Sequence, residues 1–214
     1  MPGEPGDQVP ISRADHAADS LAGFLRALHR NAPAEAPVSP NRGVPLEALA
    51  DEFAERFQAV VSSGLAAPAL DIQGIQDIWA EAVSAPRWQG PPVWLHADLH
   101  PANVVVSGGT LSGVVDFGEL CAGDPATDLA AAWSILPAGA AARFLDAYAS
   151  ASAHVSVDEA MIRRARGWAV LRGASLVGIG QAWERGLPGG KPTWGAAGRA
   201  ALGRVLAFGQ SPAR

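Results

Sequence analysis

Hydrophobic positions recur at helical spacing over two long parts of the chain, and a group of short apolar runs separates them. Ser12 and Asp15 resemble a capping box that opens an amphipathic helix, which Asn31 ends. Pro45 opens a second amphipathic helix, for which Gly64 is the natural C-terminal stop. A third helix is expected over residues 71–83, and a surface loop over residues 32–44.

The pattern changes at Val93, where short β-branched runs bounded by turn residues indicate strands. These strands are expected at residues 93–95, 103–106 and 111–117, with Gly108 and Gly109 forming a hairpin turn. Asp124 and Pro125 then form a helix start. Further helices are expected at residues 126–136, 140–152, 158–184 and 194–208. The predicted fold class is α+β, mostly helical, with a small central β-hairpin.

Composition and charge narrow the range of partners. The 214 residues are 49% hydrophobic and 17% charged, as in compact globular proteins. The net charge of −5, without any Lys/Arg-rich run, argues against nucleic acid or an anionic membrane as the main partner and favours a cationic or neutral ligand. Cys121 is the only cysteine, which excludes an intramolecular disulfide. With no signal sequence and no long uncharged apolar run, a cytoplasmic protein is expected.

Polar residues with potential chemistry gather around the hairpin, namely His96, Asp98, His100 and Asn103 before it and Asp116 after it. If the hairpin turns at the boundary between residues 109 and 110, Asn103 lies opposite Asp116. An amide oxygen and a carboxylate are hard ligands that suit Mg²⁺. Asp98 would then reach the same cleft as a general base.

Four segments carry a resemblance to a known family. HADLHPAN (residues 96–103) resembles the catalytic loop of protein kinases and of the aminoglycoside phosphotransferase family, and DFG (residues 116–118) resembles their metal-binding motif. GDPATDLA (residues 123–130) and LAGFLRALH (residues 21–29) are similar to segments of the aminoglycoside branch. The resemblance implies a protein-kinase-like C-terminal lobe over residues 13–210, after a hinge-like segment 1–12 and before a short tail 211–214.

The resemblance also implies a reaction, in which the γ-phosphoryl group of a nucleoside triphosphate, ATP, passes to a hydroxyl of a small molecule. An aminoglycoside or another amino-bearing compound is one candidate acceptor. By position, Asp98 would accept or orient the hydroxyl proton, while Asn103 and Asp116 would hold Mg²⁺ and the nucleotide phosphates. His96 would brace the loop, and His100 would lie near the transferred group.

Several positions receive a plainer interpretation or depart from the family pattern. Asp124 is expected to cap a helix, and Asp128 to interact favourably with the dipole of the same helix. Ala97 and Ala102 stand where the family usually has glycine, which matters if positive φ is needed there. Weak candidates for binding a cationic acceptor are Asp146, Asp158, Glu159 and Glu184.

The nucleotide-clamping half of a kinase-like enzyme is not recognisable upstream of the catalytic loop. No glycine-rich hairpin precedes it, and the first lysine of the sequence is Lys191. We therefore expect this chain alone to be a poor kinase. A non-catalytic remnant or binding module is the alternative, with a homodimer through the exposed surface where the N-terminal lobe would dock. A metal hydrolase using Asp98, Asp116 and histidines fits the residue types but ignores the DFG spacing.

Overall fold

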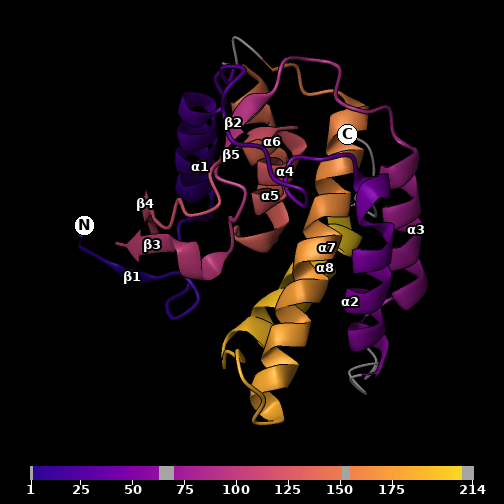
Figure 1. Ribbon diagram of the computed structural model, residues 1–214. Coiled ribbons are helices and arrows are strands. Elements are labelled where there is room, and N and C mark those ends of the chain that lie inside the picture. The colour runs from indigo at the N-terminus through magenta and orange to yellow at the C-terminus, as the bar shows by residue number, and fades with distance from the viewer. Residues whose placement is uncertain (1, 63–69, 151–154, 209–214) are drawn as a thin grey trace.

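The computed structural model describes residues 2–62, 70–150 and 155–208 of the 214 (Figure 1). Its helices are α1 (Ala14–Leu28), α2 (Ala50–Ser62), α3 (Ile72–Ser84), α4 (Ala126–Leu129), α5 (Ala131–Ser134), α6 (Ala140–Ser150), α7 (Glu159–Glu184) and α8 (Trp194–Phe208), with 3₁₀ turns η1 (Leu46–Leu49) and η2 (Pro101–Asn103). Its strands are β1 (Glu4–Pro5), β2 (Val93–Leu95), β3 (Val104–Ser107), β4 (Thr110–Val114) and β5 (Cys121–Gly123). The expected α+β, mostly helical class is confirmed.

Helix α7 forms the centre of the helical part and packs against α2, α3, α4 and α8 (Figure 1). It buries side chains on several faces, among them Trp168, Leu171 and Val177. The closest approach to α8 is made by Gly180, where a Cβ atom would collide with the backbone of Gly195. Two helices can approach this closely only where neither carries a side chain at the contact.

Helix α1 packs against α6 and β4 on the other side of the molecule (Figure 1). Its buried face includes Leu21 and Leu25, in agreement with the predicted amphipathic pattern. The predicted capping box is wrong, because Arg13 is the N-cap residue and no side chain caps the helix. The backbone amides of Ser12 and Arg13 donate instead to the carbonyl oxygen of Gly109, at 3.0 and 2.8 Å. These two hydrogen bonds therefore connect the hairpin turn to the start of α1.

Two small antiparallel sheets frame the loops between them. One has the strand order β1-β3-β4 and contains the predicted hairpin, with Gly108 and Gly109 both at positive φ. The other pairs β2 with β5, so that Leu95 faces the buried Cys121. Neither β1 nor β5 follows from the sequence pattern. The loop 96–103 leaves β2 and enters β3, while the DFG segment lies between β4 and β5.

Some predicted boundaries change in the structure. The helix expected over residues 126–136 consists of two short helices, α4 and α5, that meet at Ala130. The Gly64 stop, the last residues of the helix expected over 140–152, and the tail 211–214 lie outside the described residues. None of the helices within the described ranges has an apolar stretch long enough to span a membrane.

Candidate active site

The loop His96–Asn103 is anchored at its start by the carboxylate of Asp128, on α4. The backbone amides of His96 and Ala97 donate to its two oxygens at 2.7 and 2.8 Å, and His29 Nε2 lies 3.3 Å from Oδ2. The Asp128 side chain is fully buried. Asp128 lies in the first turn of a helix, as expected, but α4 has only four residues and the hydrogen bonds of the carboxylate go to the loop.

His96 links the same loop to the segment that follows β4. Its Nε2 lies 2.9 Å from the carbonyl oxygen of Val115, and its Nδ1 accepts from the backbone amide of Asp98 at 3.3 Å. Since a carbonyl oxygen can only accept, the ring carries its hydrogen on Nε2. The ring also packs at 4.7 Å from the Phe117 ring. His96 thus connects the loop 96–103 to the DFG segment through a hydrogen bond and a ring contact.

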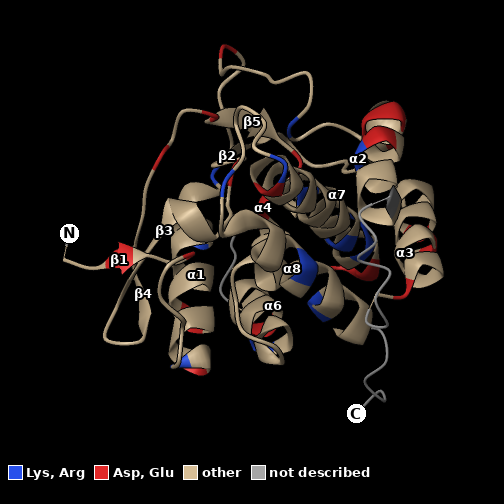
Figure 2. Cartoon of the chain, turned by 90° about the horizontal axis from the view of Figure 1, so that it is seen from below, with Lys and Arg blue, Asp and Glu red and all other residues tan. Residues whose placement is uncertain are grey.

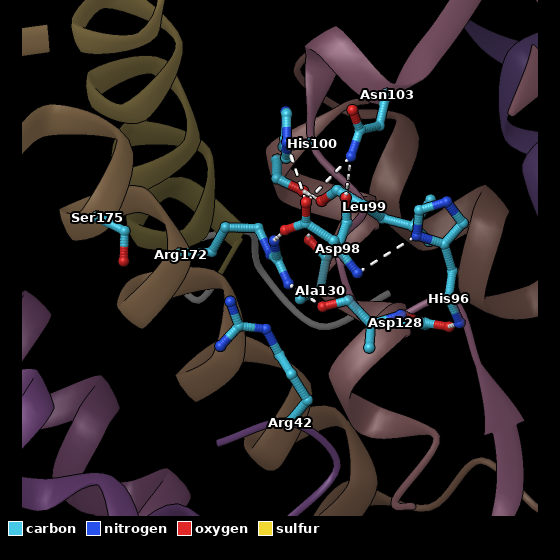
Figure 3. A network of polar contacts seen from close by, with 12 residues as sticks. Arg42, His96, Asp98, Leu99, His100, Asn103, Asp128, Ala130, Arg172 and Ser175 are labelled. Atoms are coloured by element: carbon cyan, nitrogen blue, oxygen red, sulfur yellow. Dashed lines mark hydrogen bonds and ion pairs between the residues drawn. The ribbon is translucent and has the colours of Figure 1, made fainter. Parts of the chain in front are cut away.

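Asp98 lies at the centre of a polar network (Figure 3). Arg172 Nη1 donates to Oδ1 at 2.8 Å, Asn103 Nδ2 donates to Oδ2 at 3.1 Å, and His100 Nε2 lies 3.4 Å from Oδ2. Burial raises the pKa of Asp98, but the His100 hydrogen bond and the Arg172 charge outweigh it, and the pKa falls well below its usual value. Asp98 is therefore a carboxylate that accepts hydrogen bonds across the neutral pH range.

Arg172 is the residue of this network that sequence reasoning missed. It projects from α7 with its side chain 10% exposed, and its Nη2 donates to the carbonyl oxygen of Ala97 at 2.8 Å. The one sequence signal is that an arginine interrupts an otherwise apolar helical stretch. A charge at such a position needs a buried partner, and here the partner is Asp98.

The hairpin register differs from the predicted one. A two-residue turn and an irregularity between Val105 and Val106 place Val104 opposite Val114, and the amide of Val115 donates to the carbonyl oxygen of Asn103 at 3.0 Å. Asp116 lies one residue further, exposed and at a φ of +63°. Among the described residues, no hydrogen bond joins Asp116 to Asn103. The predicted pairing of these two residues is therefore wrong.

The side-chain oxygens of Asn103 and Asp116 nevertheless suit a hard cation. Asn103 uses its Nδ2 for hydrogen bonds to the Asp98 carbonyl and carboxylate, which leaves Oδ1 as its acceptor. Asp116 uses one carboxylate oxygen to accept from the amide of Gly118 at 3.3 Å. An amide oxygen and a carboxylate match the preference of Mg²⁺, which takes few protein ligands and retains water. Within the described ranges, no group of three or more His, Cys, Asp or Glu side chains could hold a metal ion.

A cavity of about 310 Å³ opens beside Asp98 and His100, against α7 and α8. The ring of His100 packs at 4.6 Å from that of Trp194, which begins α8. The remaining lining residues are Arg42, Glu52, Arg56, Trp168, Leu171, Arg172, Ser175, Leu176 and Ile179.

None of the four acidic residues singled out as weak candidates for binding an acceptor lines this cavity. Asp158 caps α7 by accepting from the amide of Met161, Glu159 pairs with Arg163, and Asp146 lines a different cavity near α1 and α6. The acidic lining residue besides Asp98 is Glu52. The predicted cap at Asp124 is wrong by one residue, because Pro125 is the N-cap residue of α4. Asp124 precedes it, and its Oδ1 accepts from the amide of Ala126 while its Oδ2 forms a buried ion pair with Arg164.

Comparison with known proteins gives a family and a set of structural neighbours. The model of the phosphotransferase enzyme family matches residues 1–172, a range that contains the catalytic-loop motif, the DFG motif and Arg172. Among curated proteins, none matches this sequence at a significant level.

Solved phosphotransferases share the fold at low sequence identity. The GDP and kanamycin complex of APH(2")-IIia matches with a TM-score of 0.54 and 20% identity, over 97% of this chain and 69% of that one. The GDP complex of aminoglycoside 2'-phosphotransferase-IIIa gives 0.52 and 21%, over 97% and 67%. A thermostable mutant of APH(4)-Ia, bound to AMP-PNP and hygromycin B, gives 0.53 and 15%, over 97% and 70%.

The present chain spans about two thirds of the length of these solved relatives. Because the family model covers well over half of its residues, the chain belongs to the phosphotransferase enzyme family.

Proposed function

We propose that this chain provides the catalytic loop and acceptor site for transfer of the γ-phosphoryl group of ATP to a hydroxyl of a small molecule. The observation that carries the proposal is the ionised Asp98, held by three partners at the end of a cavity large enough for a small acceptor. A carboxylate in this position can accept a hydrogen bond from the attacking hydroxyl and orient its oxygen.

The other loop residues have distinct tasks in this proposal. Asn103 and Asp116 hold Mg²⁺, which neutralises charge on the nucleotide phosphates when it is bound. His96 and Asp128 fix the loop through the contacts described above. His100 lies against Asp98 and presents a buried Nδ1 that has no partner within the described residues, so it can contact the transferred phosphoryl group or the acceptor.

Nucleotide binding gives the first test. Calorimetric titration of the chain with ATP, with and without Mg²⁺, is compared with the same titration of Asp116→Ala. We expect Mg²⁺-dependent binding that Asp116→Ala loses, since the variant removes an oxygen ligand of the metal. Asp146→Ala is the matched control, because that exposed aspartate lines a different cavity.

Transfer is tested on the same protein by mass spectrometry of hydroxyl-bearing compounds incubated with Mg²⁺ and ATP. We expect slow phosphorylation that Asp98→Ala abolishes. By analogy with removal of one charged group from phosphoryl-transfer sites, transfer by this chain is expected to be roughly 10³- to 10⁵-fold slower than by a full-length kinase. Absence of ATP binding up to millimolar concentration, or binding unchanged in Asp116→Ala, would favour the binding-module alternative.

A further inference from the structure

The cavity beside Asp98 has more positive than negative charge in its lining. Three arginines reach it, Arg42 from the loop before η1, Arg56 from α2 and Arg172 from α7, against the carboxylates of Glu52 and Asp98. Arg172 pairs with Asp98 at 2.8 Å, and Arg56 pairs with Glu52 at 2.7 Å. One guanidinium, that of Arg42, therefore has no counter-charge in the lining.

The hydrogen bonds of Arg42 do not replace the missing counter-charge. Its Nη1 donates to the carbonyl oxygen of the adjacent Asn41 at 3.0 Å, and its Nε is buried without a partner among the described residues. Figure 3 shows the Arg42 side chain extending toward Arg172 and Asp98. Burial lowers the pKa of Arg172, the charge of Asp98 raises it, and the charge of Arg42 lowers it, so the Arg42 charge opposes that of Arg172. An anion between them would remove that repulsion.

The charge of the rest of the molecule does not explain the excess of arginine in the cavity lining. The chain has a net charge of −5, and acidic residues (red) predominate on α1, α2 and α3, whereas α7 and α8 carry more basic residues (Figure 2). The positive excess in the cavity lining therefore comes from Arg42, on the loop before η1, and not from the net charge of the chain. A cationic acceptor would meet Arg42 and Arg172 there, and both would oppose its binding.

We propose that the acceptor bound in this cavity carries a negatively charged group, a carboxylate or a phosphate. Arg42 and Arg172 bind this group, while a hydroxyl of the same molecule is turned toward Asp98. Ile179 and Trp194, both partly exposed in the lining, provide apolar surface for its carbon skeleton. The cavity, about 310 Å³, is at the lower end of the usual range for ligand sites, so the acceptor is of monosaccharide size. This inference rests on the proposed function, and deepens it by naming the substrate class.

The test compares molecules that share one ring and differ in charge. Ligand-observed NMR titrations of the chain, without nucleotide, measure dissociation constants for glucuronate and glucose 6-phosphate (anionic), glucose (neutral) and glucosamine (cationic). We expect the better of the two anions to bind at least about tenfold tighter than glucose, because a charge-assisted pair to Arg42 is gained. Glucosamine should bind more weakly than glucose. Comparison of the two anions distinguishes a carboxylate site from a phosphate site.

Variants of Arg42 test whether this residue causes the preference for anions over glucose. Arg42→Gln should reduce the preference of the better anion over glucose to about twofold or less, because it removes the charge that pairs with the anion. Arg42→Lys keeps the charge and should retain most of the preference, which separates loss of charge from local misfolding. Arg30→Gln is the matched control, because Arg30 is exposed and lies outside the cavity, yet the substitution changes net charge equally.

In these titrations, three outcomes would overturn the inference: glucosamine binding as tightly as the better anion, an anion preference that survives in Arg42→Gln, or no binding of either anion up to about 50 mM. Because no nucleotide is present, the result does not depend on phosphoryl transfer. Transfer to a cationic acceptor would refute this inference and leave the proposed function standing. An anion preference without any transfer would refute the proposed function and leave the anion preference of the cavity standing.

Discussion

Ala97 adopts a backbone conformation that alanine rarely takes. Its φ is +66°, and its side chain is fully buried at the start of the catalytic loop. A left-handed conformation costs an L-residue roughly 1–2 kcal/mol, which only the surrounding structure can compensate. The amide of Ala97 donates to Asp128, and its carbonyl oxygen accepts from Arg172. Both backbone groups are thus held in the strained geometry.

Two substitutions at Ala97 should have opposite effects on this strain. Ala97→Gly relieves it but removes a buried methyl worth about 0.8 kcal/mol, so the free energy of unfolding should change by less than about 1 kcal/mol. Ala97→Val should lower the free energy of unfolding by about 2 kcal/mol or more, since a β-branched residue fits positive φ poorly. Urea denaturation measures both. Ala102, the other alanine that replaces a family glycine, is not at positive φ. Ala102→Gly should therefore cost about 0.5–1 kcal/mol, and a larger loss in Ala97→Gly than in this control would contradict the strain argument.

Asp98 should stabilise the fold in a pH-dependent way. Its pKa in the folded chain lies below the usual 3.8, so its contribution is present above that pH and is lost as the pH falls below it toward the folded-state pKa. Asp98→Asn leaves the Arg172 guanidinium without its counter-charge and should lower the free energy of unfolding at pH 7 by about 2 kcal/mol.

Denaturation of wild type and Asp98→Asn between pH 7 and pH 2 measures this contribution. The difference between the two proteins should stay constant down to about pH 4 and shrink below it. Asp146→Asn, at an exposed position, should match wild type at every pH. A difference for Asp98→Asn that stays constant through the acid range would mean that the ion pair contributes nothing.

At the scale of elements, Asp128 joins three separate parts of the chain. It lies on α4, binds the first two amides of the catalytic loop, and contacts His29 just after α1. Asp128→Asn would turn one acceptor oxygen into a donor that faces other donors. We expect a loss of about 3 kcal/mol in the free energy of unfolding, together with weaker binding of Mg²⁺ and ATP. Stability within about 0.5 kcal/mol of wild type would show that the loop does not depend on this carboxylate.

The contact between α7 and α8 gives a matched pair of glycine substitutions. Gly180→Ala places a methyl against the backbone of Gly195 and should destabilise the protein by about 1–3 kcal/mol. Gly203, on α8, has nothing within 4 Å of the place that a Cβ atom would take, and Gly203→Ala should stabilise by about 0.5–1 kcal/mol through helix propensity. Thermal unfolding of both variants measures the contrast. Equal effects of the two substitutions would refute the proposed close packing.

Helices were the elements that the sequence predicted best, because their apolar positions recur over many residues. Strand β1 has only two residues and β5 (Cys121–Gly123) contains no β-branched or aromatic residue, so neither has a strand pattern, and they form by pairing with β3 and β2. The predicted cap at Ser12 failed for a related reason. The carbonyl oxygen of Gly109 receives the amides of Ser12 and Arg13, and a partner so distant in the chain leaves no local signal.

At the scale of the whole molecule, the candidate site combines residues that the sequence keeps far apart. The motifs predicted the loop with Asp98 and Asn103, since both lie within eight consecutive residues. The partner Arg172 follows Asp98 by 74 residues along the chain, and Arg42 precedes Asp98 by 56. Such contacts depend on how α7 packs, which no local pattern encodes. The same limit applies to the hairpin register, where one irregularity moved Asp116 away from Asn103.

Cys121 should report unfolding of the whole molecule. It is 3% exposed in β5, and burial, with a smaller contribution from the charge of Asp128, raises the pKa of its thiol to about 11. At pH 8, a thiol reagent should label the native protein at least about 10³-fold more slowly than the unfolded chain. Labelling in native buffer and in concentrated urea, followed by absorbance, measures the ratio. Rapid labelling with unchanged circular dichroism would mean that the β2–β5 pair opens locally.

The anchoring of the loop 96–103 by Asp128 also has a consequence for the proposed function. Ordering one residue of backbone costs roughly 1–2 kcal/mol in lost conformational entropy. In this chain, the loop is tied to α4 and to the segment after β4 by contacts that need no ligand. That entropy loss therefore occurs during folding. In the proposed function, a substrate that reached Asp98 would meet a hydrogen-bond acceptor already in position, so its contacts would contribute to affinity and not to ordering the loop.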